Sequence, residues 1–559
     1  MGRVRRTIYL GALFALTVTA CGPSAQPPPP EAPKGKAAET AAPAKPAEAA
    51  KPASAPAATT APAAKPAEAK PAGAVDTEAR VVVSQATDAD TLHFILLSST
   101  NSQMIARLIM EGLYETDPLS GKFIPVLAES YRNPDPKTWE FKLRRGVKFH
   151  NGDPVTVQDV AYSYDIAVND PKSRLSTIKP NIEGTEIVDD STIRIKTKVI
   201  YPSFIDNIAS SVKIIPANYA KQVGTDGFNL KPIGSGPYKF VEWAKDDHLT
   251  LTRNDDYWGD KAKIKEIVWK PIPDAATRVA ALETGQSDLI VHLPPTEAQR
   301  LQASRDMTIK KVPSMRTIYI GMNTGTGKAE TVDEPLKDVR VRHAIQRAID
   351  YDAIIRDVLK GDGIRVASTL VPANWGFDKD LKPIDYSPDE AKKLLAEAGY
   401  PNGITIDFDV PSGRYLLDRE VGEAVAGQLA KAGIKTNLAI QEWGAFYDKY
   451  LGLKDKGIYL LGVGKDIYPD GHFFTYYHSK GRGFYFSDPD VDGLIDKALS
   501  TLDESVRMDA FKQLQRVLQD KAHWAYLYEQ MDIYGFRNRL QFEPTPDEFM
   551  HLEKSQVTK

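Results

Sequence analysis

Apolar residues in the C-terminal four-fifths of the chain recur with two different periods, and segments of the two kinds alternate. Residues 80–83 form a short apolar run, and residues 192–197 and 249–252 alternate in the way of half-buried strands. Residues 102–113 and 503–519 place apolar side chains at helical spacing. Alternating helices and strands predict a large α/β protein.

Local signals mark several turns and helix ends. Ser387 begins a capping box with proline at the first helical position, and Gly399 is a natural stop for that helix. Asn151 and Gly152 form a dipeptide typical of a tight hairpin turn. Trp139, with Phe141 and Leu143 at alternating positions, indicates a core strand nearby.

The N-terminus has the features of an export signal. Arg3, Arg5 and Arg6 precede an apolar stretch over residues 8–18 that is too short to span a membrane stably. The following run, Val-Thr-Ala-Cys21, resembles the bacterial lipobox, in which the cysteine is acylated. We therefore expect residues 1–20 to be a lipoprotein signal peptide and Cys21 to be lipidated. The alternative is an ordinary signal peptide that leaves a free thiol on a secreted protein.

Residues 21–77 consist largely of Ala, Pro, Lys and Glu. Such a segment cannot bury enough apolar surface to offset its ordering entropy, which predicts a disordered tether. A binding tail is the alternative, although the interspersed charges do not favour an electrostatic partner.

Composition excludes several classes of protein. Cys21 is the one cysteine among 559 residues, so neither an internal disulfide nor a cysteine-based metal or catalytic site can form. A formal net charge of −3 gives no basic field for nucleic acid. No segment after the signal peptide holds enough consecutive apolar residues to cross a membrane, so we expect attachment through lipid.

Four blocks in succession resemble family 5 of the extracytoplasmic solute-binding proteins, the peptide/nickel/opine class. The resemblance covers about residues 78–540, with the blocks in order and at sensible spacing. The blocks are residues 125–160 (PVLAES, WEFKLRRGVKFHNG and PVTVQDV), 234–258 (GSGPYKF and NDDYW), 336–350 (LKDVRVR and AID) and 386–401 (YSPDEAKKLLAEAGYP).

The resemblance implies the family's fold, a type II periplasmic-binding-protein-like two-lobed clamshell with an additional inserted domain. Carried over to this chain, the inserted domain is residues 120–224 and lobe II is residues 323–522. Lobe I is then residues 78–119, 225–322 and 523–559.

The same resemblance implies the solute-binding component of an ABC transporter, which captures a small ligand for import. Di- and oligopeptides are the expected ligands, and the alternatives on this scaffold are a nickel or metal chelate, an opine or a sugar. The implied partners are permease subunits with their ATPases, and the implied location is extracytoplasmic, at the membrane through the lipid anchor. We expect a monomer without a cofactor or a metal site. A sensor or chaperone that keeps the fold is a further alternative.

An enzyme is the least favoured interpretation. Gly234-Ser235-Gly236 lacks the spacing of a nucleophile elbow. Gly325-Thr-Gly-Lys328 fails as a phosphate loop because Ala329 replaces the required serine or threonine. We therefore do not expect a hydrolase.

The richest candidate for ligand contact is the segment 464–478, which follows the apolar strand 458–463. Loops at strand ends are where α/β proteins bind ligands. In peptide-binding members of the family, an aspartate in the matching loop holds the ligand's α-amino group, and two aspartates compete for that position here. The alternative is a solvated turn with core tyrosines. The candidates in this segment are Asp466, Tyr468, Asp470 and His472.

Five further residues are candidates outside that segment. Trp443 and Phe446 follow a strand-like stretch and offer aromatic faces, with core packing as the alternative. Arg414 lies in a loop resembling one seen in many family members, and it suits a ligand carboxylate or phosphate unless it is simply solvated. Trp375 and Asn101 complete the predicted set.

Overall fold

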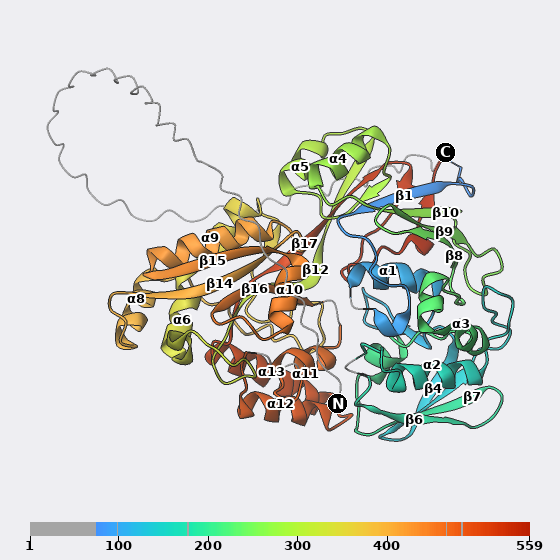
Figure 1. Ribbon diagram of the computed structural model, residues 1–559, viewed down its shortest axis with the longest axis horizontal. Helices are drawn as coiled ribbons and strands as arrows, with labels where there is room; N and C mark the ends of the chain where they lie inside the picture. The colour runs from blue at the N-terminus through green and yellow to red at the C-terminus, as the bar shows by residue number, and fades with distance from the viewer. Residues whose placement is uncertain (1–73, 98, 176–177, 465–466, 482–484) are drawn as a thin grey trace, which may run out of the picture. The chain divides into compact units, whose positions relative to one another are not determined.

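The computed structural model describes residues 74–97, 99–175, 178–464, 467–481 and 485–559 (Figure 1). The predicted signal peptide, Cys21 and Asp466 lie outside the described residues. The last four residues of the predicted tether are described and are not free. Val75 forms an antiparallel bridge with Thr558, and the Asp76 backbone nitrogen donates to the Val557 carbonyl at 2.8 Å. The tether prediction therefore extends too far, because backbone pairing with the C-terminus orders these residues.

A mixed sheet of eleven strands runs through the described part of the chain (Figure 1). Its order, from one edge to the other, is β15 (Ile434–Glu442), β14 (Ile404–Ser412), β16 (Ile458–Gly464), β12 (Met307–Met322), β17 (Trp524–Arg537), β11 (Leu289–Ile290), β1 (Arg80–Gln85), β10 (Glu266–Pro271), β9 (His248–Arg253) and β8 (Tyr238–Ala244), while β13 (Gly363–Ile364) pairs with β17. Parallel and antiparallel pairs both occur, and the predicted strands at 80–83 and 249–252 are confirmed in β1 and β9.

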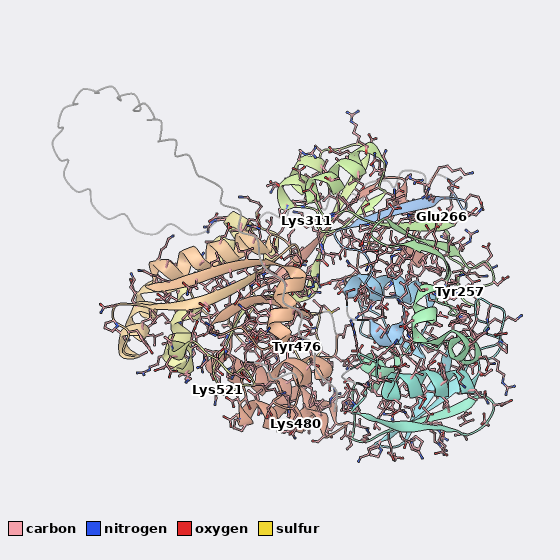
Figure 2. All side chains as sticks on the ribbon, in the orientation of Figure 1. Tyr257, Glu266, Lys311, Tyr476, Lys480 and Lys521 are labelled. Carbon is pink, nitrogen blue, oxygen red and sulfur yellow. The ribbon has the colours of Figure 1, made fainter. Side chains whose placement is uncertain are left out.

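The long antiparallel strands β12 and β17 join the two halves of this sheet. Their register shifts between Pro313 and Thr317, where a bulge interrupts the pairing. Near it, Lys311 on β12, labelled in Figure 2, donates to both oxygens of Asp362 at 2.7 and 2.9 Å. Bulges bend a strand and increase its twist, so this bulge bends the sheet at the place where its two halves meet.

A second sheet, antiparallel, is built from β4 (Ala128–Asp135), β5 (Thr138–Leu143), β7 (Thr192–Thr197) and β6 (Ile182–Ile187), in that order. Trp139, Phe141 and Leu143 on β5 are buried, which confirms the predicted core strand. Helix α2 (Val157–Asn169) packs on β6 and starts with a capping box between Thr156 and Asp159. Two short hairpin-like pairs complete the strands, β2 (Tyr114–Thr116) with β3 (Phe123–Pro125) and β18 (Leu540–Gln541) with β19 (Gln556–Val557).

The remaining helices cover the faces of the large sheet or link its strands. The α-helices are α1 (Thr100–Ile109), α3 (Ala217–Leu230), α4 (Ala275–Thr284), α5 (Pro295–Leu301), α6 (Val339–Ala348), α7 (Tyr351–Ala353), α8 (Pro388–Glu397), α9 (Asp418–Lys431), α10 (Trp443–Leu451), α11 (Asp470–Tyr477), α12 (Pro489–Leu499) and α13 (Glu504–Asp520). Short 3₁₀ or π turns are η1 (Phe94–Leu96), η2 (Ile205–Ala209), η3 (Glu334–Lys337), η4 (Ile354–Val358) and η5 (Leu552–Lys554).

Alternation along β12 separates the core of the second half into two layers. Ile318 and Ile320 point into a cluster with α6, α8 and α9, whereas Met315 and Tyr319 point into one with α11, α12 and α13. The period of two in a strand sends successive side chains to opposite faces, which explains the division. This half is therefore a sheet with helices on both faces.

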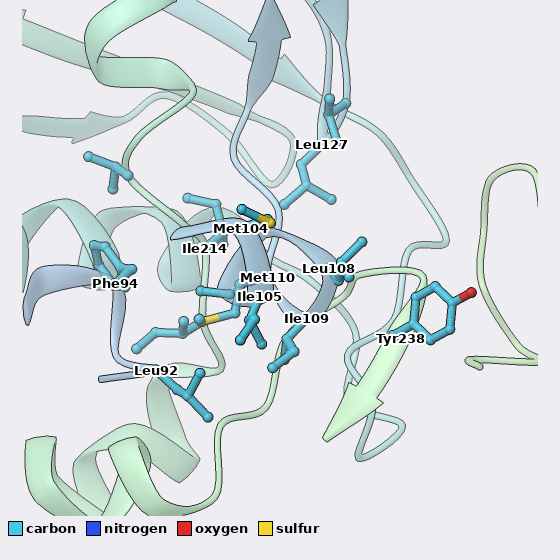
Figure 3. Packing of buried hydrophobic residues seen from close by; sticks show 14 of the residues in the cluster. Leu92, Phe94, Met104, Ile105, Leu108, Ile109, Met110, Leu127, Ile214 and Tyr238 are labelled. Carbon is cyan, nitrogen blue, oxygen red and sulfur yellow. The ribbon is translucent and has the colours of Figure 1, made fainter. Parts of the chain in front are cut away.

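Helix α1 forms the core of the first half. Ile105, Leu108 and Ile109 are fully buried beside Phe94 and Ile214 (Figure 3). The predicted helix at 102–113 is confirmed in type but is shorter. It begins earlier, since Ser99 caps it, and it ends at Ile109, since the next residue is extended.

Two of the sequence blocks meet at the end of α1. A Cβ on Gly234 would lie 2.1 Å from the Ile109 carbonyl oxygen, so only glycine allows this approach. Buried Glu111 then accepts hydrogen bonds from the Ser235 hydroxyl at 2.7 Å, the Tyr257 hydroxyl at 2.6 Å and the Trp258 indole at 3.0 Å. Burial raises the pKa of Glu111 to about 7. These blocks are therefore structural and tie distant segments together.

Local predictions elsewhere have mixed outcomes. Gly152 adopts a φ of +93° in a hairpin turn, as expected. Helix α8 begins at Pro388 and stops before Gly399, which has a φ of +94°. The predicted capping box is wrong, because the Ser387 side chain makes no capping hydrogen bond to α8. Helix α13 begins one residue after its predicted start, with Asp503 as its cap.

Candidate functional site

A cavity of about 230 Å³ opens among segments that are distant in sequence. One wall comes from α1, β2 and the segment of η2 up to Lys213. The other walls come from Met315 on β12, from Ile467, and from the C-terminal residues Asp547, Phe549 and His551. Segments predicted for lobe I, the inserted domain and lobe II thus all contribute, which is the arrangement expected of a ligand site between lobes.

A chain of buried charges supports one wall of this cavity. Arg107 lies 3.6 Å from Glu115 and 3.1 Å from Glu553. His551 bonds to Glu553 at 3.1 Å and to Asp547 at 3.0 Å through its two ring nitrogens. Both partners are carboxylates, so the protonated ring, with a donor on each nitrogen, is favoured here. Burial lowers the pKa of His551, but these two hydrogen bonds outweigh it and raise the pKa above its usual value. The cavity wall therefore carries fixed charges of both signs.

Arg414 lies on a loop whose backbone is fixed by hydrogen bonds to Asp418. The carboxylate of Asp418 accepts from the backbone nitrogens of Gly413, Arg414 and Tyr415 at 2.9–3.1 Å. The Arg414 guanidinium carbon lies 5.2 Å from the centre of the Tyr415 ring and 5.6 Å from that of Trp443. Aromatic faces attract such a cation, so they orient the guanidinium.

No acceptor among the described residues forms a hydrogen bond or ion pair with this guanidinium. The nearby carboxylate of Glu548 is already engaged by Arg316, which donates to it at 2.6 and 2.7 Å. Burial and the charge of Arg316 lower the pKa of Arg414. A guanidinium that is partly shielded from water and has no anion beside it keeps its donors available for an anionic group.

The predicted aromatic contacts Trp443 and Phe446 lie in different surroundings, one partly exposed and the other in the core. Trp443 starts α10 and is partly exposed, with its ring 4.8 Å from that of Tyr447 and 6.0 Å from that of Tyr415. Phe446 has no exposed surface and belongs to the core. The structure corrects the prediction of ligand contact at Phe446, because its position on α10 turns the ring inward.

The predicted loop over residues 464–478 is in part a helix, α11, which begins at Asp470. Asp470 is 1% exposed and accepts twice from one terminal nitrogen of Arg507, at 2.6 and 2.8 Å. The same guanidinium lies 4.6 Å from the centre of the Trp375 ring. Asp470 is therefore a structural residue in this conformation, which corrects its prediction as a ligand contact. Its competitor Asp466 lies outside the described residues.

Tyr468 bridges two segments beside the cavity. Its hydroxyl donates to the Gly121 carbonyl at 3.4 Å, and its ring lies 5.3 Å from that of Phe123 and 6.0 Å from that of Trp375. Tyr468 and Trp375 are partly exposed and adjoin the cavity residue Ile467, whose carbonyl accepts from the Trp375 backbone nitrogen at 2.8 Å. The structure thus places these two predicted residues next to the cavity.

The last two candidates have structural contacts. His472 is 6% exposed and shares a hydrogen bond of 2.9 Å with the Thr369 hydroxyl, and burial lowers its pKa to about 3. This neutral, buried ring does not face the cavity, so the structure corrects its prediction too. Asn101 on α1 is partly exposed and donates to the Thr87 carbonyl at 3.3 Å.

Sequence reasoning missed most residues that line the cavity. Arg107 lies more than 400 residues before Asp547 and His551 in the chain, and no local pattern links it to them. Lys213 gave the one available signal, because it interrupts the buried apolar run formed by Val212, Ile214 and Ile215.

Residues 122–486 match the sequence profile described as bacterial extracellular solute-binding proteins, family 5 middle. The match spans well over half of the chain. The chain belongs to this family. Family membership agrees with the cavity, since solute-binding proteins of this kind hold a ligand and are non-enzymatic components of transporters.

Curated relatives and solved structures agree with the assignment. The glutathione-binding protein GsiB of Pectobacterium atrosepticum is 29% identical over 487 residues, which cover 82% of this chain and 90% of the relative. The dipeptide-binding protein of Escherichia coli K12 is 28% identical over 431 residues, covering 71% of this chain and 79% of the relative. The ABC transporter-associated periplasmic binding protein DppA of Helicobacter pylori, solved with the peptide STSA, superposes with a TM-score of 0.77 at 24% identity, covering 86% of this chain and 98% of that one.

The family assignment confirms the predicted solute-binding role and the type of fold. Across the described residues, no helix is both long and apolar enough to cross a membrane. The contribution of this chain is to bind the solute.

Proposed function

We propose that this family 5 protein captures a short peptide or peptide-like acid outside the cytoplasm and delivers it to the permease subunits of an ABC importer, which carry associated ATPases. The observation that supports this most strongly is the cavity of about 230 Å³, bordered by segments of both proposed lobes and lined by charges of both signs. A zwitterionic ligand needs both signs within a small volume. A neutral sugar would make no use of these charges.

The size of the cavity favours a short ligand. Pockets for drug-sized molecules usually enclose about 300–1,000 Å³, and this cavity falls below that range at about 230 Å³. Two of the curated relatives are named for glutathione and for dipeptides, and the H. pylori structure holds a four-residue peptide. A ligand of two or three residues fits these observations together.

Two charged residues are the proposed anchors for the ends of such a ligand. Arg414 presents a guanidinium without an anionic partner and suits the α-carboxylate through paired hydrogen bonds. Asp466 is the proposed acceptor for the α-amino group, because Asp470 is engaged by Arg507. Trp443 supplies aromatic surface beside Arg414, and Trp375 and Tyr468 supply it next to the cavity residue Ile467.

A metal-chelate carrier is the second candidate, but no observation favours it over a peptide binder. In the described ranges, no three histidine, cysteine, aspartate or glutamate side chains converge in a way that could hold a metal ion. His472 and His478, the one histidine cluster of the sequence, have separate partners, the buried Thr369 and the exposed Asp496.

We propose that the domain boundaries carried over from the family apply to this chain. The four-stranded sheet lies within the proposed inserted domain, residues 120–224. Residues 78–119, 225–322 and 523–559 contribute β1, β8 to β12 and β17 to the large sheet. Residues 323–522 contribute β13 to β16 with their flanking helices.

We propose that Cys21 is acylated and holds the protein at the membrane, with residues 1–20 removed as a signal peptide. We expect Cys21→Ser, expressed in a lipoprotein-processing bacterium, to move the protein from the membrane to the soluble fraction, because no other lipid attachment remains. The control is Ser24→Ala, which leaves the cysteine intact. A Cys21→Ser protein that stays in the membrane fraction would contradict the anchor.

The test of the proposed function is to identify the molecule that co-purifies with the protein, by releasing it under denaturing conditions and measuring its mass. A short peptide or peptide-like acid supports the function. A ligand without both an amine and an acid group overturns it.

A further inference from the structure

Lys213 is an isolated cation in an apolar stretch of the cavity wall. Its neighbours Val212, Ile214 and Ile215 are fully buried, and the segment runs directly out of η2. The ammonium nitrogen donates to the Ser210 carbonyl at 2.7 Å. In the part of the chain that the structure describes, no carboxylate oxygen lies within 4.0 Å of it. An ammonium has three donors, so donor capacity remains for a ligand.

The acidic residues of the cavity already have partners of their own. Asp547 accepts from His551 and from the Thr545 hydroxyl, at 3.0 and 2.6 Å. Glu115 pairs with Arg107, and Asp206 accepts from the Thr116 hydroxyl at 2.6 Å. These carboxylates therefore do not neutralise Lys213. Burial lowers the pKa of the Lys213 ammonium, and the charge of Glu115, which acts in the opposite direction, does not offset this effect.

A second unused donor comes from the same wall. Asn207 on η2 lines the cavity, and its side-chain amide nitrogen is buried without a hydrogen-bond partner among the described residues. Buried polar groups are nearly always paired, so an orphaned donor indicates a missing acceptor. Lys213 keeps unused donors, and the Asn207 amide has no acceptor among the described residues, so a carboxylate would supply oxygens to both.

We propose that Lys213, together with Asn207, forms a subsite that selects ligands with a second acidic group, so that the preferred ligands are acidic di- or tripeptides and related dicarboxylic acids. This inference rests on the proposed peptide-binding function and adds to it the chemical class of ligand. The α-carboxylate goes to Arg414, and the additional carboxylate goes to the wall formed by η2 and Lys213. A single lysine and a neutral amide suit a monoanion, which favours a carboxylate over a phosphate dianion.

Matched peptide pairs test this subsite. Ligand-free protein is titrated by calorimetry with Ala-Glu against Ala-Gln and with Glu-Ala against Gln-Ala, since either position can present the side-chain acid. We expect the wild type to bind at least one acidic peptide about 10-fold to 100-fold more tightly than its amide twin, the range of a charge-assisted hydrogen bond. Lys213→Gln should abolish this preference, and Lys213→Arg should retain most of it.

Lys245→Gln is the control, because Lys245 is an exposed lysine remote from the cavity lining. It should keep the wild-type preference. If the wild type binds the acidic and amide peptides equally, or if Lys213→Gln keeps the preference, the subsite is wrong while peptide binding stands. If the wild type binds none of the four peptides, the proposed function fails and the subsite fails with it. Thermal unfolding of each variant confirms that lost preference is not lost folding.

Discussion

Replacing Asp470 by alanine is expected to lower the free energy of unfolding by about 3–5 kcal/mol, the usual cost of leaving one member of a buried ion pair alone. The side chains of Asp470 and Arg507 are 1% and 6% exposed, and their closest atoms lie 2.6 Å apart. Without Asp470, the Arg507 guanidinium would be buried with only the ring of Trp375 against it. The measurement is denaturant unfolding followed by circular dichroism, with the midpoint compared at constant slope.

Two variants make this prediction specific. Asp509→Ala removes an exposed aspartate from the same helix as Arg507 and should change the free energy of unfolding by less than about 0.5 kcal/mol. The double variant Asp470→Ala/Arg507→Met should be more stable than Asp470→Ala, because it leaves no unpaired charge. An Asp470→Ala protein as stable as the wild type, yet unable to bind peptides, would restore Asp470 as a ligand contact.

Replacing Arg414 by alanine is expected to weaken peptide binding by about 100-fold to 1,000-fold without destabilising the protein. Removing one partner of a desolvated charge pair costs about 2–5 kcal/mol, and each 1.4 kcal/mol is a factor of ten in affinity. Among the described residues, Arg414 has no anionic partner, and burial together with the nearby charge of Arg316 lowers its pKa. Its removal therefore relieves a repulsion, so stability should stay constant or rise. Calorimetry with Ala-Ala and thermal unfolding give the two readouts.

Arg419→Ala is the matched control, since Arg419 is exposed on α9 only five positions away. It should bind with wild-type affinity. Arg414→Lys keeps the charge but loses the paired donors, so it should fall between the wild type and Arg414→Ala. An Arg414→Ala variant with wild-type affinity for Ala-Ala would remove Arg414 from the site, and a large loss of stability would show that its role is structural.

The spacing of apolar residues predicted helices and strands well where one face of the segment is buried. The strand at residues 192–197 was recovered with its bounds, because Ile193, Ile195 and Thr197 face the core and the residues between them do not. Helix ends were harder to predict. The end of α1 depends on the approach of Gly234 from more than a hundred residues away, which no local pattern encodes.

The site was predicted less well than the fold. Arg414, Trp375 and Tyr468 stay predictions, and they were chosen because they sit in loops after strands or in a segment that resembles the family. Asp470 and His472 were misjudged because a polar residue in a loop-like segment looks the same in sequence whether it faces solvent or an internal partner, here Arg507 and Thr369. Only three-dimensional packing distinguishes the two cases.

The central claim is that this protein carries a short peptide or peptide-like acid. The most direct measurement is the mass and fragmentation pattern of the molecule that the full chain retains when purified from its native cells without denaturation and then releases on unfolding. We expect one dominant small molecule per protein, a peptide or peptide-like acid of two or three residues with an amine and an α-carboxylate. A sugar, a metal chelate lacking these groups, or a molecule that binds equally well to Arg414→Ala would contradict it.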